Sequence, residues 1–333
     1  MPASTGESDL KGTLVKVEDY TARAALDMEE RYLRIDENGI YKPHQPIYGF
    51  RQLPSEPDHV LRYAITFAML DVLSRISFST LLDVGGAEGY KGFLAQSLLG
   101  ASVVTTDLSL EACNRAREIF NLDARPADIH SLPFANQSFD VITCSETLEH
   151  VPDLRAAVIE LLRVARTAVV ITVPHESEAS VKAHMKGSCP HIHSLTPDSF
   201  NFVSDYGWRI VSVQRLIHPL GIRQLMATLD ARTRPEDGNP VRRLAIAAHN
   251  AIRPVTELFT GLRTAKAMIA VDRWACRLSG QFSAMVLVAA KEDCVGHRRR
   301  KVELDAILRF AVPRHPLSHG IPLRNPVVRS IRG

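Results

Sequence analysis

The amino-acid sequence predicts an α/β fold in which a mostly parallel sheet is covered by helices on both faces. First, an apolar strand pattern at residues 80–84 runs through a glycine-rich turn, 85–89, into a helical pattern at 90–99. Second, strand and helix patterns alternate from there to residue 173, as is typical of parallel sheets. Third, 45% of the 333 residues are apolar, enough to build one large domain or two small ones.

The N-terminal stretch is predicted to be an extension in front of this fold. Residues 1–12 are small and polar, a helix is expected over 17–34, and a segment with four prolines follows at 41–57. The extension carries four of the seven tyrosines of the chain: Tyr20, Tyr32, Tyr41 and Tyr48. Two interpretations stay open: these rings close over a bound ligand, or they pack the extension onto the body.

The elements of the core follow in order. A helix is expected from residue 58, because its apolar residues recur at the spacing of one buried face. Strands are expected at 80–84, 101–105, just before 127, 138–145 and 168–173, with a helix at 153–163. Two last strands, 208–217 and 281–291, are separated by about 60 residues, longer than an ordinary connection. This insertion contains an apolar helical stripe after Pro254, formed by Val255, Leu258, Phe259, Leu262, Ala265 and Ile269.

The glycine-rich turn has the chemistry of a ligand site. A strand that stops at such a turn leaves backbone N–H groups at the start of the next helix, where a ligand bearing oxygens can approach them. Asp83 lies before the turn, and Asp107 follows 18 residues after Gly89 at the tip of the next strand, where a carboxylate suits two vicinal ribose hydroxyls. Asp128 ends the third unit. The turn alone also fits dinucleotide enzymes and plain tight turns.

With these spacings, residues 60–218 and 281–292 resemble the class I S-adenosylmethionine-dependent methyltransferases. The resemblance implies a Rossmann-like, seven-stranded, mostly parallel sheet with an antiparallel last strand, and S-adenosylmethionine as cofactor. It also implies that the cofactor is held by residues of the turn and the strand ends: Asp83, Gly85, Gly86, Gly89, Asp107, Leu108, Asp128, Ile129 and Ser145. Ala87 departs from the family, which usually has glycine there, and a methyl group is tolerable if φ is negative.

A second group of residues follows the fourth strand. Glu146, Glu149 and His150 stand at i, i+3 and i+4, so they share one face of a helical turn. Two carboxylates and an imidazole favour a divalent cation between them, with Mg²⁺, Mn²⁺, Fe²⁺ and Zn²⁺ all open.

The Glu-x-x-Glu-His pattern and the later His191-Ile-His193 resemble the ubiquinone-biosynthesis O-methyltransferases and the small-RNA 2′-O-methyltransferases. By that resemblance Glu146, Glu149, His150 and His193 would hold the metal, with His191 as a substitute for His193. The alternative has no metal, since Glu-His pairs occur widely in this superfamily without one. His150, His175, His191 or His193 would then act as the general base, with Glu146 as a further candidate.

Charge is distributed unevenly. The net charge is +3, but residues 297–333 carry +7 and residues 241–280 carry +5. We therefore expect four parts: an extension or lid (1–57), a methyltransferase core (58–218 with 281–296), a helical insertion (219–280) and a basic tail (297–333). The two basic parts fit an anionic membrane surface, and the insertion also fits a substrate lid or a homodimer contact.

The expected location of the protein in the cell is based on features that its sequence lacks. There is no charged-then-apolar leader and no apolar run of membrane-spanning length. The five cysteines have no disulfide-like spacing. A cytoplasmic protein, peripheral to the inner face of the membrane, is expected.

The sequence thus predicts in-line methyl transfer from S-adenosylmethionine to a hydroxyl of a small-molecule, glycan or lipid-linked acceptor, with base or metal assistance. Three alternatives remain. One is N-methylation, since an amine needs less help from a base. Another is RNA 2′-O-methylation, disfavoured because no aromatic-rich RNA-binding motif is evident. The third is an adaptor that has lost the cofactor, against which the retained acidic and glycine residues argue.

Overall fold

The computed structural model describes residues 17–50, 58–184, 190–219, 262–296 and 300–312. Its centre is a seven-stranded sheet with the order β3-β2-β1-β4-β5-β7-β6. The strands are β1 (Thr80–Val84), β2 (Ser102–Asp107), β3 (Asp123–Pro126), β4 (Phe139–Ser145), β5 (Ala165–Pro174), β6 (Arg209–Leu216) and β7 (Ala284–Ala290). All neighbours pair in parallel except β7, which is antiparallel to both β5 and β6. The predicted mostly parallel sheet with an antiparallel last strand is confirmed.

Two hydrophobic clusters cover the two faces of this sheet, because successive strand side chains point to opposite sides. Leu81 packs into the first cluster and the adjacent Leu82 into the second. Helices α2 (Asp58–Leu73), α3 (Tyr90–Leu99) and the end of α4 (Leu110–Phe120) supply the first cluster. Helix α5 (Leu154–Val164), with the 3₁₀ segments η1 (Leu148–His150) and η2 (Pro197–Tyr206), supplies the second.

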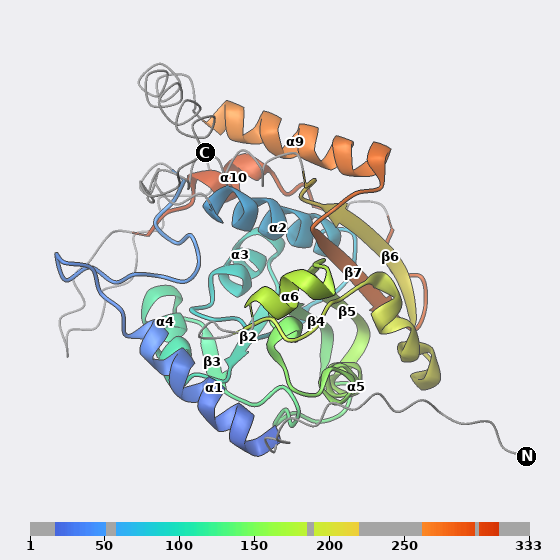
Figure 1. The fold of residues 1–333 in the computed structure, drawn as a ribbon, viewed down its shortest axis with the longest axis horizontal. Helices are drawn as coiled ribbons and strands as arrows, with labels where there is room; N and C mark the ends of the chain where they lie inside the picture. The colour runs from blue at the N-terminus through green and yellow to red at the C-terminus, as the bar shows by residue number, and fades with distance from the viewer. Residues whose placement is uncertain (1–16, 51–57, 185–189, 220–261, 297–299, 313–333) are drawn as a thin grey trace, which may run out of the picture.

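The N-terminal extension lies against this body. Helix α1 (Val17–Tyr32) packs on α4, as Figure 1 shows at the edge of the molecule. Glu29 of α1 accepts the backbone N–H groups of Leu110 and Glu111 at the start of α4, and a carboxylate there is stabilised by the helix dipole. Tyr32 and Tyr41 are 0% and 3% exposed, so these rings fasten the extension to the core.

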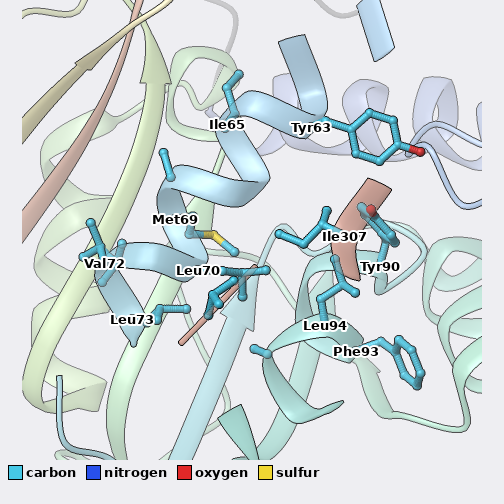
Figure 2. Close-up of a cluster of buried hydrophobic side chains, with 14 of the residues drawn as sticks. Tyr63, Ile65, Met69, Leu70, Val72, Leu73, Tyr90, Phe93, Leu94 and Ile307 are labelled. Carbon is cyan, nitrogen blue, oxygen red and sulfur yellow. The ribbon is translucent and has the colours of Figure 1, made fainter. Parts of the chain in front are cut away.

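The C-terminal part also contributes to the core. Helix α10 (Leu304–Arg309) lies within the stretch assigned to the basic tail, and it buries Leu304, Ile307 and Leu308. Figure 2 shows Ile307 among the side chains of Tyr90 and Leu94 from α3. Phe310 then packs on Phe93 with ring centroids 5.3 Å apart. This apolar spacing was not recognised in the sequence because basic residues surround it.

The remaining described elements are α6 (Glu178–His184) and α9 (Leu262–Ser279), which packs on β6 and α10. In the predicted stripe, Ile269 is buried. Val255, Leu258 and Phe259 lie outside the described residues, as does the whole of 220–261, including the expected loop at 235–240, and 313–333. Cys113 and Cys144 are buried free thiols. Among the described helices, none combines the length and the apolar character needed to cross a bilayer.

Candidate active site

A cavity of about 470 Å³ opens at the carboxyl ends of the central parallel strands. Its walls include the turn after β1, the ends of β2 and β4, residues 127–130 and the N-terminal elements α1 and α2 with the strap between them. They are completed by residues 149–152, by Pro174, Glu176 and His191, and by residues beside β6 and β7 (Ile217, Ser283 and Ala284). The carboxyl edge of an open parallel sheet is where such folds bind ligands.

The glycine-rich turn forms one wall. Gly85 has φ +67°, and a Cβ at this position would lie 2.2 Å from Thr147 Oγ1, so only glycine fits. A Cβ on Gly86 would lie 2.8 Å from Asp83 Oδ2, and Gly89 has φ +82° as the residue before α3. Ala87 has φ +53°. The condition stated for tolerating a methyl group there, a negative φ, is therefore not met, and the alanine adopts a left-handed conformation at a cost of about 1 kcal/mol.

Asp107 holds this turn from the tip of β2. Its Oδ2 accepts the N–H of Ala87 at 2.9 Å, and its Oδ1 accepts the N–H of Ser109 at 3.0 Å. Burial, with a smaller contribution from the nearby Asp83 charge, raises the pKa of Asp107 to about 6, against the lowering effect of the two N–H donors. Asp107 also lines the cavity.

Asp83 lies beneath the turn rather than in the cavity wall. Thr143 Oγ1 donates to its Oδ1 at 2.7 Å, and burial raises the pKa of its carboxyl. By contrast, Asp128 lines the cavity together with Leu108 and Ile129. Its side chain is 37% exposed, and its Oδ1 accepts the backbone N–H of His130 at 2.9 Å.

A strap at residues 44–46 closes the same wall from outside the sheet. The N–H of Gln45 donates to Glu88 Oε1 at 2.7 Å, and Gln45 Oε1 accepts the N–H of Tyr90 at 3.0 Å. Gln45 thereby satisfies one of the backbone donors at the start of α3. His44 lines the cavity, and burial holds its pKa well below its usual range, so the ring is neutral near pH 7.

Polar side chains connect this wall with the other side of the cavity. Lys91 Nζ, 8% exposed, donates to Ser145 Oγ. Ser145 Oγ also contacts Thr172 Oγ1, which donates to Glu146 Oε1 at 3.2 Å. Burial lowers the pKa of Lys91, while the charges of Glu146 and Asp83 oppose that shift. Glu146 has φ +55°, the kind of strained backbone that is common in functional sites.

Glu149, His150 and His191 converge on the far side of the cavity. One potential ligand atom from each lies within 4.8 Å of the others. Glu149 is 1% exposed, and among the described residues its Oε2 has no hydrogen-bond partner. Burial, followed by the charge of Glu146, raises the pKa of Glu149 well above its usual range. The pKa of His150 is lowered by burial to about 4, so its ring is neutral near pH 7.

Each of these rings is oriented through its Nδ1 atom. His150 Nδ1 contacts the carbonyl oxygen of Pro190 at 3.0 Å, and His191 Nδ1 contacts the carboxylate of Glu176. The two rings meet edge to face with centroids 4.8 Å apart. Metal-binding histidines usually have such a second partner on the ring.

Comparison with known proteins relates part of this chain to a family. Residues 82–172 match the family model described as a methyltransferase domain. That range runs from the strand before the glycine turn to Thr172, beside Ser145, and includes Asp107 and Asp128. Over this part of the chain the sequence is similar to methyltransferase domains.

Two curated relatives and one solved structure show how far the similarity extends. The chain is 28% identical over 134 residues to phthiotriol/phenolphthiotriol dimycocerosates methyltransferase 1 of Mycobacterium ulcerans, over 39% of this chain and 48% of that one. It is 29% identical over 128 residues to an O-methyltransferase of Pyrenophora dematioidea, over 35% and 48%. The structure of geranyl diphosphate C-methyltransferase from Streptomyces coelicolor A3(2) has a TM-score of 0.48 at 15% identity, covering 82% of this chain and 98% of that chain.

The matched segments thus span between 35% and 48% of the curated relatives' own lengths. The similarity supports the methyltransferase domain only. The acceptor has to be inferred from residues outside the matched segments.

The predicted site residues differ in where they lie relative to the cavity. Those in the cavity wall are Gly85, Asp107, Leu108, Asp128, Ile129, Ser145, Glu146, Glu149, His150 and His191. Asp83, Gly86 and Gly89 shape the turn from behind. His193 is directed elsewhere: its Nε2 contacts the carbonyl oxygen of Val151 at 2.6 Å. The structure therefore places His191, not His193, beside Glu149 and His150.

Sequence reasoning missed several residues of the wall. His44, Gln45, Arg31 and Arg62 reach it from the N-terminal elements, and Lys91 reaches it from α3. A buried lysine one turn into a helix that follows a glycine-rich turn is a usable signal, because lysine is almost never buried without a partner. The N-terminal residues gave no such signal, because only the tertiary contacts bring them to the cavity.

Proposed function

We propose that the protein transfers a methyl group from S-adenosylmethionine to a hydroxyl group of a small-molecule, glycan or lipid-linked acceptor. The observation that carries this proposal is the shared cavity. The glycine turn, Asp107 and Asp128 form one side of it, and the group of Glu149, His150 and His191 forms the other. A methyl donor and an acceptor can therefore meet in one enclosed site, where positioning supplies much of the rate enhancement.

The cofactor side fits an adenosyl compound with a ribose and a charged methionine part. Gly85 has no side chain to block the approach of a ligand to the backbone, and the Asp107 carboxylate can accept hydrogen bonds from hydroxyl groups. In this proposal Asp107 binds the ribose, Asp128 with Leu108 and Ile129 binds the adenine, and Ser145 lies near the methionine part. Bound S-adenosylmethionine supplies an electrophilic methyl group.

The acceptor side fits a divalent cation. Glu149 Oε2 is a buried carboxylate oxygen without a hydrogen-bond partner, and such an atom is costly unless something satisfies it. One carboxylate and two imidazoles suit Mn²⁺, Fe²⁺ or Zn²⁺, and Mg²⁺ if more oxygen ligands come from acceptor or water. We propose Glu149, His150 and His191 as the protein ligands, with Glu146 beside them. A bound cation would lower the pKa of an acceptor hydroxyl.

The side chains of the chain itself would then position the acceptor. The contacts from Lys91 through Ser145 and Thr172 to Glu146 join the cofactor wall to the acceptor wall. Lys91 would balance the negative charges of Glu146 and Glu149, and Ser145 would keep the acceptor in line with the donor. The name of one relative, an O-methyltransferase, also favours a hydroxyl acceptor.

The first experiment is calorimetric titration of the full-length protein with S-adenosylmethionine. Binding in the micromolar range is expected. Failure to bind at about millimolar cofactor would favour the non-catalytic adaptor and would refute the proposed activity.

The second experiment measures transfer of a labelled methyl group to a panel of sugars, phenols and lipid-linked alcohols, with and without a chelator. Glu149→Gln should lower turnover about 100-fold or more and abolish the effect of added metal, while cofactor affinity stays within about twofold. The matched control is Glu178→Gln, because the Glu178 side chain is 81% exposed on α6. Unchanged turnover after both chelation and Glu149→Gln would remove the metal from the mechanism.

A further inference from the structure

Helix α9 presents an apolar stripe to the outside of the molecule. The stripe consists of Val271, Trp274 and Leu278, whose exposed fractions are 63%, 63% and 68%. At 100° per residue these three side chains fall within an arc of about 60° on the helix. Isolated exposed apolar residues are ordinary, but large ones gathered on one helix face mark a contact surface.

The opposite face of α9 is buried against the body of the protein, so the stripe points outward. Ile269, Asp272 and Cys276 on that face are 1%, 4% and 0% exposed. Asp272 accepts the backbone N–H groups of Ile217 and His218 at 2.9 and 3.0 Å, which joins the helix to the end of β6. Figure 1 shows α9 at the outer edge of the molecule, beside α10 and away from α1.

The charges that α9 itself exposes beside the stripe are positive. Exposed Lys266 and Arg277 lie beside it on the helix, Lys266 in an ion pair with Asp305 of α10 at 3.0 Å, and the one acidic residue of α9 is the buried Asp272. The whole stretch 241–280 carries a net charge of +5. An apolar stripe that contains tryptophan and is flanked by cations is typical of helices that lie in the interface of an anionic bilayer.

We propose that the α9 stripe docks the protein on an anionic membrane surface. A second copy of the chain fits this face less well. A two-fold contact between the stripes of two copies would bring Lys266 and Arg277 of each copy near those of the other, and α9 offers no exposed acid to pair with them. Lipid headgroups supply the negative charge that the helix itself lacks.

The chain carries its own reporter for this proposal. It has two tryptophans; Trp208 is 4% exposed, whereas Trp274 is 63% exposed. The full-length protein is mixed with phosphatidylcholine vesicles containing about one quarter phosphatidylglycerol, and binding is followed by co-sedimentation and by tryptophan emission. We expect co-sedimentation at low salt and a blue shift of the emission. Vesicles of phosphatidylcholine alone should bind at least about tenfold less protein.

Variants separate the stripe from the rest of the surface. Val271→Ser with Trp274→Ala and Leu278→Ser should lower partitioning onto the anionic vesicles about tenfold or more, with unchanged thermal stability because all three side chains are exposed. Trp274→Phe should keep binding but lose the blue shift. The matched control is Leu26→Ser on α1, where Leu26 is 69% exposed, and it should bind like the original protein.

Three results would overturn the proposal. The first is no binding of the original protein to anionic vesicles, and the second is equal binding by the triple variant. The third is a blue shift without vesicles that grows with protein concentration, together with a doubled mass in sedimentation. That result would assign the stripe to a second copy of the chain. These measurements do not involve methyl transfer, so their outcome is independent of the proposed activity.

Discussion

The two sides of the cavity are built differently. The cofactor side comes from consecutive strand ends, and its contacts are short-range hydrogen bonds to backbone, such as those of Asp107 with Ala87 and Ser109. The acceptor side joins Glu149 and His150, which are neighbours in the chain, with His191 from a distant loop. The first side is held by hydrogen bonds to backbone N–H groups, whereas the second gathers buried titratable side chains whose pKa values are shifted by burial.

This difference separates a general task from a specific one. A turn built from glycines and backbone donors can serve any enzyme that uses the same cofactor, and its residues can be recognised by spacing. A buried carboxylate such as Glu149, whose pKa is raised by burial, has an energetic cost in the free protein and is more typical of a functional site than of a structural one.

The largest effect is expected on the cofactor side. Gly85→Ala would put a Cβ 2.2 Å from Thr147 Oγ1 at a φ of +67°. Cofactor affinity should fall more than about 100-fold, since the turn must shift, and the free energy of unfolding should fall by about 2–4 kcal/mol. Calorimetry and thermal unfolding would measure both.

A matched variant sharpens this prediction. Gly39 also has a positive φ, +75°, but a Cβ there meets nothing within 4 Å. Gly39→Ala should therefore cost only about 1 kcal/mol and leave cofactor binding unchanged. Adding Thr147→Ala to Gly85→Ala should restore part of the affinity. Equal losses for the two glycine variants would mean that backbone strain, rather than the clash, is decisive.

The next effect is expected on the acceptor side, where two nearby histidines should behave differently. His191 lies in the group with Glu149 and His150, whereas His193 contacts the carbonyl oxygen of Val151. His191→Asn should abolish metal stimulation and lower turnover about 100-fold. His193→Asn should lower the free energy of unfolding by about 1 kcal/mol with turnover within about threefold. The reverse pattern would return His193 to the ligand set.

The smallest effect concerns pH and the cofactor side. The pKa of Asp107 is raised to about 6, so its carboxylate is ionised at pH 7.5 and becomes protonated as the pH falls through about 6. Cofactor affinity should then fall about three- to tenfold between pH 7.5 and 5. The folded state of the free protein takes up this proton more readily than the unfolded state, so Asp107 raises stability as the pH falls through the same range.

Asp107→Asn tests the assignment. This variant should bind the cofactor more weakly at pH 7.5, and the pH dependence of its affinity between 7.5 and 5 should be lost. If the dependence remains, a group other than Asp107 is responsible for it.

The sequence predictions succeeded where the signal was local and failed where it depended on tertiary contacts. The strand at 80–84, the turn and the helix at 90–99 were predicted at their observed positions, because period-two and helical patterns next to glycines are local signals. Helix α10 was missed, since a single apolar turn within a basic stretch has no clear pattern. The sign of φ at Ala87 was left as a condition, because the conformation there is held by a bond from its N–H to Asp107, 20 positions away.

By itself, the sequence determined the α/β fold and the position of Asp107 and Asp128, which line the cavity at the strand ends, because both depend on spacing along neighbouring segments. Only the tertiary structure decided that His191 rather than His193 joins Glu149, that Lys91 reaches Ser145, and that residues 44–46 close the cavity. The physical reason is that hydrogen bonds and burial act between atoms a few ångströms apart, whatever their separation in the chain. A loop such as 190–196 can present either of two histidines until the contacts of the folded protein choose one.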